Sequence, residues 1–319
     1  MRNSRIHEVK ECINRAVNDG LVKDLELKGA TGKKVLAVLQ HCVNLLTPDE
    51  CYLEIGVYRG LSLISTSSVR QDISTFGIDN FTQFDQDGTN RLFIENTIQS
   101  MSLQNTTLIN LDFEDALHQL DYYLQGKKIG IFFIDGPHDY RSQLVCLLMS
   151  KKYLSDQAII VVDNSNYNHV RQANQDFLYS HPDFKLLFEG YTKSHPANLK
   201  GDDLNHAWDT WLDGINVIVR DPYNELRPMY PPTIRDRALF FADHRIHPMR
   251  NSVMAWRAAK IPAVIKPFKP FLFFAFLAKL FIETRKRNRD DIEPWMFINS
   301  HSQDLPFYNM NNFVSNDKS

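Results

Sequence analysis

The chain has 319 residues, enough for one large domain or two domains of moderate size. Apolar residues make up 43% of it and charged residues 23%, which is typical of a globular protein and excludes global disorder. With 36 Lys and Arg against 38 Asp and Glu, the formal net charge is −2. This balance argues against a dedicated nucleic-acid-binding protein, whose surface is usually strongly basic.

The cysteines and the first residues indicate the cellular compartment. Four cysteines lie far apart without any CxxC pair, so we expect reduced, buried thiols rather than disulfides or a zinc site. Residues 1–10 are polar, unlike a signal peptide, and no apolar run reaches the ~18 residues of a membrane-spanning helix. These features predict a cytoplasmic protein.

The first 48 residues predict two helices. Apolar side chains recur at helical spacing from Ile6 to Val17 and again from Val35 to Leu46, and Pro48 ends the second pattern. We therefore expect residues 1–48 to form an N-terminal helical cap.

Residues 49–220 follow a different pattern, in which short apolar runs alternate with amphipathic segments. Continuous apolar runs are typical of strands covered by helices on both faces, and the alternation predicts βαβ units. The expected strands are 51–56, 75–78, 107–111, 129–134, 158–162, 184–188 and 215–219, and the expected helices are 61–69, 89–100, 114–120, 141–153 and 169–180. The predicted fold class is α/β, with a Rossmann-like, doubly wound, mostly parallel seven-stranded sheet, N-terminal helices and a C-terminal irregular and helical extension.

A long connection, 189–213, separates the last two expected strands and shows little apolar periodicity. Connections of this length often serve as lids or binding loops. Within the loop 191–211, His195, Asp202, His206, Trp208 and Trp211 are candidates to line an acceptor pocket, with the tryptophans stacking on a ring. The alternative is that both tryptophans anchor the loop to the core.

Residues 221–319 form the predicted C-terminal extension, which begins with a proline-rich segment. Its segment 268–282 is strongly aromatic and is followed by a basic run at 285–289. This pattern is compatible with an interfacial membrane helix, with a homodimer surface, or with a helix packed on the main domain. The sequence leaves these alternatives open.

The strongest local motif follows the first expected strand, where Glu54 is followed by Gly56, Gly60 and Ser62. A glycine there lets the backbone turn sharply and approach a ligand, and the next helix begins with free N–H groups that favour an anion. The motif is neither GxGxxG nor a Walker loop, which speaks against a dinucleotide or nucleoside triphosphate site. Taken alone, it is also compatible with a simple strand-to-helix turn.

Asp79 ends the second expected strand about 20 residues after the glycine loop, where an acid can accept hydrogen bonds from a ribose. With this acid, the glycine loop, the order of elements and the polar stretch 112–115, the chain resembles the class I S-adenosylmethionine-dependent methyltransferases. The resemblance implies that Glu54 and Gly56 border the methionine part of the cofactor, that Asp79 binds the ribose and that Asp112 binds the adenine. Further implied cofactor contacts are Tyr58, Gly60, Ser62 and Asp135.

A second group of polar residues follows the fourth and fifth expected strands: Asp135, Asp163 and Asn164. In a parallel sheet these strand ends lie on the same edge as Glu54 and Asp79, so we expect all of them to face a common crevice. Two carboxylates and an amide oxygen suit Mg²⁺ or Ca²⁺, and such an ion can lower the pKa of a substrate hydroxyl.

Here the resemblance narrows to the metal-dependent O-methyltransferases of the catechol type and to a related bacterial group that modifies sugars and antibiotics. It implies Asp135, Asp163 and Asn164 as metal ligands. His138 lies three residues after the first ligand, where the catechol type has a lysine base, so His138 and Asp135 are the candidate catalytic residues. The alternative is that these residues only form turns and helix caps.

The sequence therefore predicts an S-adenosylmethionine-dependent methyltransferase that uses Mg²⁺ and a small-molecule hydroxyl acceptor, a sugar or a phenol, with no nucleic-acid partner. The rival interpretations are a metal-independent methyltransferase, a nicotinamide-dependent oxidoreductase and a non-catalytic binding protein on a similar fold.

Overall fold

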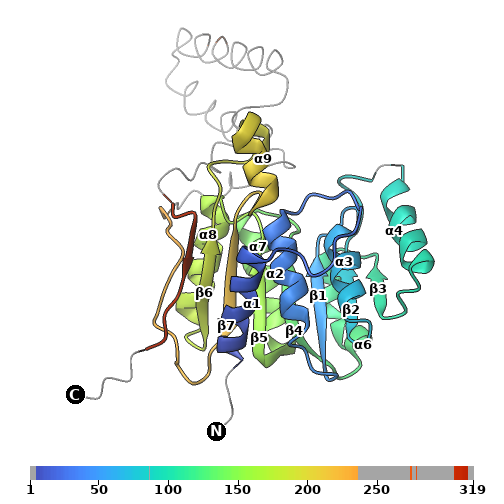
Figure 1. Ribbon diagram of the computed structural model, residues 1–319, viewed down its shortest axis with the longest axis horizontal. Helices are drawn as coiled ribbons and strands as arrows, with labels where there is room; N and C mark the ends of the chain where they lie inside the picture. Colours follow the sequence, from blue (N-terminus) through green and yellow to red (C-terminus); the bar gives the residue numbers. More distant parts are fainter. Residues whose placement is uncertain (1–4, 86, 236–273, 275–277, 279–304, 315–319) are drawn as a thin grey trace.

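The computed structural model describes residues 5–85, 87–235, 274, 278 and 305–314. Within them, each apolar run assigned to a strand forms one, and the chain end adds another (Figure 1). The strands are β1 (Glu50–Ile55), β2 (Ser74–Ile78), β3 (Thr106–Ile109), β4 (Lys128–Ile134), β5 (Leu154–Val162), β6 (Phe184–Gly190), β7 (Ile215–Arg220) and β8 (Tyr308–Met310).

The strand order in the sheet is β3-β2-β1-β4-β5-β7-β6-β8. Strands β1 to β5 are paired in parallel, whereas β7 is antiparallel to β5 and β6, and β8 is antiparallel to β6. The predicted α/β class and mostly parallel sheet are confirmed. Seven strands were predicted, whereas the described residues form eight. The additional strand, β8, has three residues and forms by pairing with the edge of β6.

The helices agree closely with the sequence pattern, with two additions: short α6 directly after α5, and α9 in the long connection. They are α1 (Ile6–Asn18), α2 (Lys33–Val43), α3 (Leu61–Val69), α4 (Thr89–Ser100), α5 (Phe113–His118), α6 (Leu120–Leu124), α7 (Tyr140–Ser150), α8 (Asn168–Ser180) and α9 (Gly201–Asp209). Helix α9 was not predicted, because it buries only Ala207 and so lacks an apolar stripe.

Helices cover both faces of the sheet (Figure 1). Alternate residues of each strand enter opposite layers: Tyr52 of β1 packs with α1, α2 and α3, whereas Leu53 packs with α5, α7 and α8. Burial on both faces explains why the strands are continuous apolar runs. The four cysteines lie in these layers as buried free thiols, as expected.

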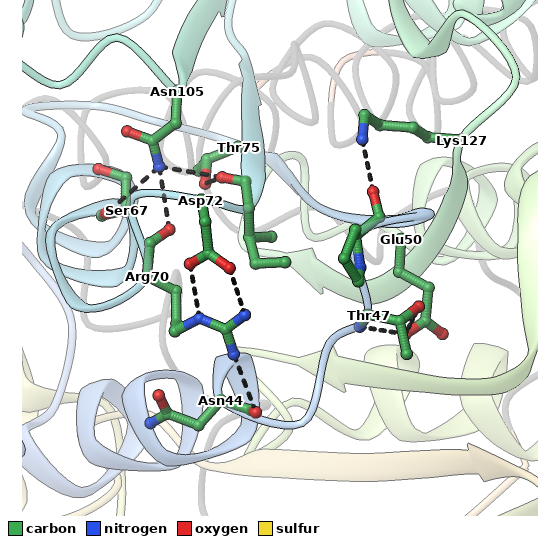
Figure 2. A network of polar contacts seen from close by, with 11 residues as sticks. Asn44, Thr47, Glu50, Ser67, Arg70, Asp72, Thr75, Asn105 and Lys127 are labelled. Atoms are coloured by element: carbon green, nitrogen blue, oxygen red, sulfur yellow. Dashed lines mark hydrogen bonds and ion pairs between the residues drawn. The ribbon is translucent and has the colours of Figure 1, made fainter.

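Polar contacts connect the segments that precede β1, β2, β3 and β4 (Figure 2). The Asn105 side chain donates to three backbone carbonyls, one in the last turn of α3 and two in the α3–β2 connection. Arg70 pairs with Asp72 through two bonds of 2.7 Å and also donates to the Asn44 carbonyl, while Lys127 donates to the turn before β1. The loops that carry the candidate site lie at the opposite edge of the sheet.

Part of the predicted C-terminal extension lies outside the described residues, including most of the segment 268–282 and the basic run 285–289. Within 268–282 only Phe274 and Ala278 are described; both are helical, and Phe274 is 66% exposed. In the part of the chain that the structure describes, no helix is long and apolar enough to cross a membrane. The boundaries of the predicted segments 1–48, 49–220 and 221–319 stay predictions.

Candidate functional site

Four acids stand side by side at the carboxyl edge of the sheet, at the ends of β2, β1, β4 and β5. The backbone N–H groups of Asp79, Asp135 and Asp163 continue the ladder bonds, each donating to the last carbonyl of the neighbouring strand over 2.9–3.1 Å. Glu54 lies within β1, between β2 and β4. The parallel ladder therefore brings together the four strand ends that the sequence analysis assigned to a common edge.

The loop after β1 depends on two glycines with positive φ. Gly56 has φ +89°, and a Cβ atom there would lie 2.0 Å from the Asp135 carbonyl oxygen. Gly60 has φ +79° and directly precedes α3. Between them Tyr58 has φ +51°, an uncommon conformation for a non-glycine residue, and its side chain is 37% exposed. The loop after β1 thus packs tightly against the loop after β4 while it presents Tyr58 outward.

Asp79 holds this loop in place. Its Oδ2 atom accepts the backbone N–H groups of Val57 and Tyr58 at 2.9 Å each, and Oδ1 accepts that of Phe81 at 2.7 Å. A carboxylate offers about four lone-pair positions, so Asp79 retains room for a hydroxyl donor such as a ribose. The sequence predicted the position of this acid but not its support of the glycine loop.

Glu54 is fully buried beneath the loop. The Tyr52 hydroxyl donates to Glu54 Oε2 over 2.6 Å, and the Ser62 hydroxyl of α3 donates to Oε1 over 3.2 Å. Burial raises the pKa of Glu54 to about 8, the Asp79 carboxylate acts in the same direction, and the two hydroxyl donors offset this only partly. Ser62 is buried with Glu54 and ties the first turn of α3 to β1.

Asp112 begins α5 beside the loop after β2. Its Oδ1 atom accepts the backbone N–H of Glu114 over 2.9 Å as an N-cap, and its Oδ2 atom accepts from the Asn80 amide over 3.3 Å. The residue implied for adenine binding therefore lies near the residue implied for ribose binding, since Asn80 directly follows Asp79.

Asp135, which is partly buried, and Asp163, which is buried, form a pair of like charges. Burial raises the pKa of Asp135 well above its usual range, and the carboxyl groups of Asp163, Glu54 and Asp213 raise it further. Burial likewise raises the pKa of Asp163 to about 7. Such a pair must share a proton or lie beside a cation, because two adjacent buried carboxylates repel each other strongly.

Asn164 has φ +55° and donates its Nδ2 to Asp213 Oδ2 over 3.0 Å. Three buried oxygens here have no hydrogen-bond partner among the described residues: Asp163 Oδ1, Asn164 Oδ1 and Asp213 Oδ1. Burial and the nearby Asp163 raise the pKa of Asp213 to about 8. Buried acceptors without donors are costly, by about 1–3 kcal/mol each, so this arrangement suits a cation or a donating ligand.

Asp213 was missed by the sequence analysis. It precedes β7, and because β7 runs antiparallel to β5, the amino end of β7 lies at the carboxyl edge of the parallel strands. The available signal was an acid followed by Gly214 and a buried strand. A strand assumed to be parallel would have placed this acid at the opposite edge.

Two histidines are close to the acids of the site: His138 follows Asp135 by three residues, and His195 lies near Asp213 in space. His138 is partly buried in the turn between Asp135 and α7, whose N-cap is Asp139. His195 in the long connection has its Nε2 atom 4.0 Å from Asp213 Oδ2, and its ring lies 6.4 Å from that of Tyr167.

The two tryptophans of the long connection differ in environment. Trp211 is fully buried, packs on the Phe188 ring at 5.2 Å between ring centroids and covers Gly190. This packing favours the anchoring role for Trp211. Trp208, on α9, is 39% exposed.

Comparisons with known proteins gave a family match and several similar solved structures. Residues 53–165 match the model of a family described as a methyltransferase domain. No curated protein matches the sequence. Similar solved structures include the O-methyltransferase from Bacillus cereus in complex with SAH (15% identity, 69% of this chain and 92% of that chain, TM-score 0.44).

Two further solved structures come from antibiotic biosynthesis. The O-methyltransferase TomG from Streptomyces achromogenes, involved in tomaymycin synthesis, shares 13% identity over 69% of this chain and 91% of its own (TM-score 0.44). The TDP-rhamnose 3′-O-methyltransferase of calicheamicin biosynthesis shares 15% identity over 58% and 77% (TM-score 0.42). The matched residues 53–165 run from β1 to the end of β5 and include the glycine loop, so this part of the chain is similar to a methyltransferase domain.

Proposed function

We propose that this protein transfers a methyl group from S-adenosylmethionine to a hydroxyl oxygen of a small molecule, a sugar or a phenol, with the help of a divalent cation. The proposal is supported by one observation above all. Buried oxygen atoms of Asp163, Asn164 and Asp213 have no hydrogen-bond partner among the described residues, at the carboxyl edge of a sheet whose residues 53–165 match a methyltransferase domain.

The residues suited to hold S-adenosylmethionine are those around the glycine loop. Gly56, Tyr58 and Gly60 shape the loop, Asp79 retains acceptor capacity for the ribose, and Asp112 lies near it for the adenine. The sulfonium of this cofactor supplies an activated methyl group, so the protein mainly has to align the acceptor oxygen with the methyl carbon.

Asp135, Asp163 and Asn164 fit a hard cation such as Mg²⁺ by the chemistry of their donors. No group of three or more His, Cys, Asp or Glu side chains suited to a metal occurs among the described residues, so the amide oxygen of Asn164 is needed to complete the set. When bound, the cation would hold the acceptor hydroxyl and lower its pKa.

The chain's own residues then handle the proton. As the acceptor oxygen bonds to the methyl carbon and the carbon–sulfur bond breaks, the hydroxyl proton must leave. We assign its removal to His138, in the turn after Asp135, because an imidazole accepts a proton near neutral pH.

Calorimetric titration with S-adenosylhomocysteine tests the cofactor. We expect binding by the unmodified protein, at least tenfold weaker binding by Asp79→Ala, and unchanged binding by the control Asp115→Ala, because Asp115 is an exposed acid of α5. Binding of NADPH in place of S-adenosylhomocysteine would favour an oxidoreductase and contradict the proposal.

Methyl transfer to a panel of sugars and phenols tests the cation. We expect EDTA to abolish the transfer and Mg²⁺ to restore it. Transfer that is insensitive to EDTA would indicate a metal-independent enzyme, in which Asp135 and Asp163 act as direct proton acceptors. Cofactor binding without transfer to any acceptor of the panel would favour a binding protein.

The cytoplasmic location, the lack of a nucleic-acid partner and the dimer or membrane contact through 268–282 belong to the same proposal. They rest on composition and sequence pattern alone.

A further inference from the structure

Asp213 sits at the turn that leads into β7 and is held against the turn after β5. The backbone N–H of Asn166 donates to the Asp213 carbonyl and that of Ser165 to the Gly214 carbonyl, over 2.9 Å each. The Asp213 side chain is 4% exposed. Two backbone bonds thus fix the distance between this carboxyl group and the residues that follow β5.

The contact between Asp213 and Asn164 determines which end of the Asn164 amide is presented to the site. Asp213 Oδ2 accepts a hydrogen bond from Asn164 Nδ2 over 3.0 Å. When Asp213 is ionised, as it would be beside a cation, its carboxylate only accepts hydrogen bonds, so the amide turns its NH₂ group toward Asp213 and its oxygen away from it. That oxygen, Asn164 Oδ1, is buried and has no partner among the described residues.

His195 also turns an N–H group toward Asp213. Its Nδ1 atom accepts the backbone N–H of Ala197 over 3.1 Å, so the neutral ring carries its proton on Nε2. This Nε2–H lies 4.0 Å from Asp213 Oδ2. His195 thus turns an N–H group toward Asp213 beyond hydrogen-bond distance, whereas Asn164 donates to it directly.

The side-chain contact of Asp213 with the proposed ligand set is its hydrogen bond with Asn164. This bond is the contact through which Asp213 can act on the orientation of Asn164.

We propose that Asp213 is a positioning residue that makes Asn164 an oxygen donor for the divalent cation of the site. The proposal rests on the proposed cation-assisted function and adds a residue to it. Groups that orient metal ligands in this way commonly change metal affinity by about 10–100-fold when they are replaced.

The test exchanges the hydrogen-bond donor and acceptor between positions 164 and 213. In Asp213→Asn the new amide can present either its oxygen or its NH₂ group to Asn164, so the orientation of Asn164 is no longer enforced. In the double variant Asn164→Asp/Asp213→Asn, the amide at position 213 donates to the carboxylate at position 164, whose second oxygen stays available. The formal charge of this double variant equals that of the unmodified protein.

Binding of Mn²⁺ to the full chain, followed by electron paramagnetic resonance, gives a readout independent of activity. We expect at least tenfold weaker Mn²⁺ binding in Asp213→Asn, recovery to within about threefold in the double variant, and no change in the exposed control Asp24→Asn. S-adenosylhomocysteine binding should be the same in all of them, because the glycine loop is untouched.

The outcomes separate the two proposals. Equal Mn²⁺ binding by Asp213→Asn and the unmodified protein would overturn the role of Asp213 and leave cation assistance intact. Absence of Mn²⁺ binding in the unmodified protein would overturn both, and S-adenosylhomocysteine binding would then show whether methyl transfer itself survives. If Asp213→Asn does not fold, the double variant decides alone: retained Mn²⁺ binding supports the role, and its loss rejects it.

Discussion

At the scale of single residues, Gly56 shows how closely the loops of the site approach each other. A side chain there would meet two obstacles, a left-handed backbone conformation and the Asp135 carbonyl oxygen 2.0 Å from the ideal Cβ position. The contact with Asp135 depends on the neighbouring strand, whereas the backbone conformation does not. A glycine with a similar φ but no such contact can therefore separate the two costs.

Alanine at a position with positive φ costs roughly 1 kcal/mol of unfolding free energy. We expect Gly56→Ala to cost well over this amount, because the loop after β4 must also move. Gly126→Ala is the matched control, since Gly126 has φ +91° and nothing lies within 4 Å of its Cβ position. Urea unfolding measures both. Equal losses in the two variants would mean that the contact with Asp135 is easily relieved.

Glu54 makes the stability depend on pH. Its pKa of about 8 in the folded protein exceeds the ordinary value of 4.5, so the folded state keeps a proton that the unfolded chain has lost. Between these two values the stability falls as the pH rises, by at most about 1.4 kcal/mol per pH unit from this group.

We therefore expect Glu54→Gln to flatten the decrease in stability between pH 5 and pH 8, as measured by urea unfolding at several pH values. Glu26→Gln is the control, because Glu26 is exposed and should leave the slope unchanged. An identical slope in Glu54→Gln and the unmodified protein would contradict a raised pKa at this position.

At the scale of elements, the Asp112 side chain of the α5 N-cap has a structural role and a predicted role in cofactor binding. Asp112 caps the helix through the Glu114 N–H and also lies where the adenine is expected. Asn caps helices about as well as Asp, whereas Ala does not.

We expect Asp112→Ala to lower the free energy of unfolding by about 1 kcal/mol and Asp112→Asn to leave it nearly unchanged, in thermal or urea unfolding. If Asp112 also binds the cofactor, both variants should weaken S-adenosylhomocysteine binding in calorimetry. Full affinity in Asp112→Asn would limit the residue to its role as a cap.

Strand β7 shows how the direction of one element changes the site. Because β7 runs antiparallel, the turn before it reaches the carboxyl edge and brings Asp213 to Asn164. The apolar run 215–219 indicated a buried strand, but such a run reads the same in both directions.

At the scale of the whole molecule, a buried ion pair fastens the start of the N-terminal helices to the sheet. Arg5 donates to both oxygens of Glu50 over 2.9 and 2.7 Å, and both side chains are 8% exposed. Burial alone would raise the pKa of Glu50, but the Arg5 and Thr47 hydrogen bonds outweigh it and hold this pKa below its usual range.

We expect Arg5→Met to cost about 3 kcal/mol of unfolding free energy, because it leaves a buried carboxylate unpaired. The exposed pair Lys33–Asp209 provides the control, and Lys33→Met should cost less than about 1 kcal/mol. Since the pKa of Glu50 is lowered, the difference between Arg5→Met and the unmodified protein should shrink as the pH falls below about 4. A loss as small as that of Lys33→Met would show that α1 does not depend on this tie.

Local sequence determined much of this protein. The assigned strands lie close to their predicted positions, except that β5 begins four residues before the expected 158–162. Asp79, Asp135 and Asp163 directly follow strand ends, because apolar runs and the polar residues that stop them are encoded locally. Tertiary structure alone decided the direction of β7, the pairing of β8 with β6, the burial of Trp211 and the contact of Asp213 with Asn164. Each of these joins residues distant in the chain, through backbone pairing or packing that no local pattern specifies.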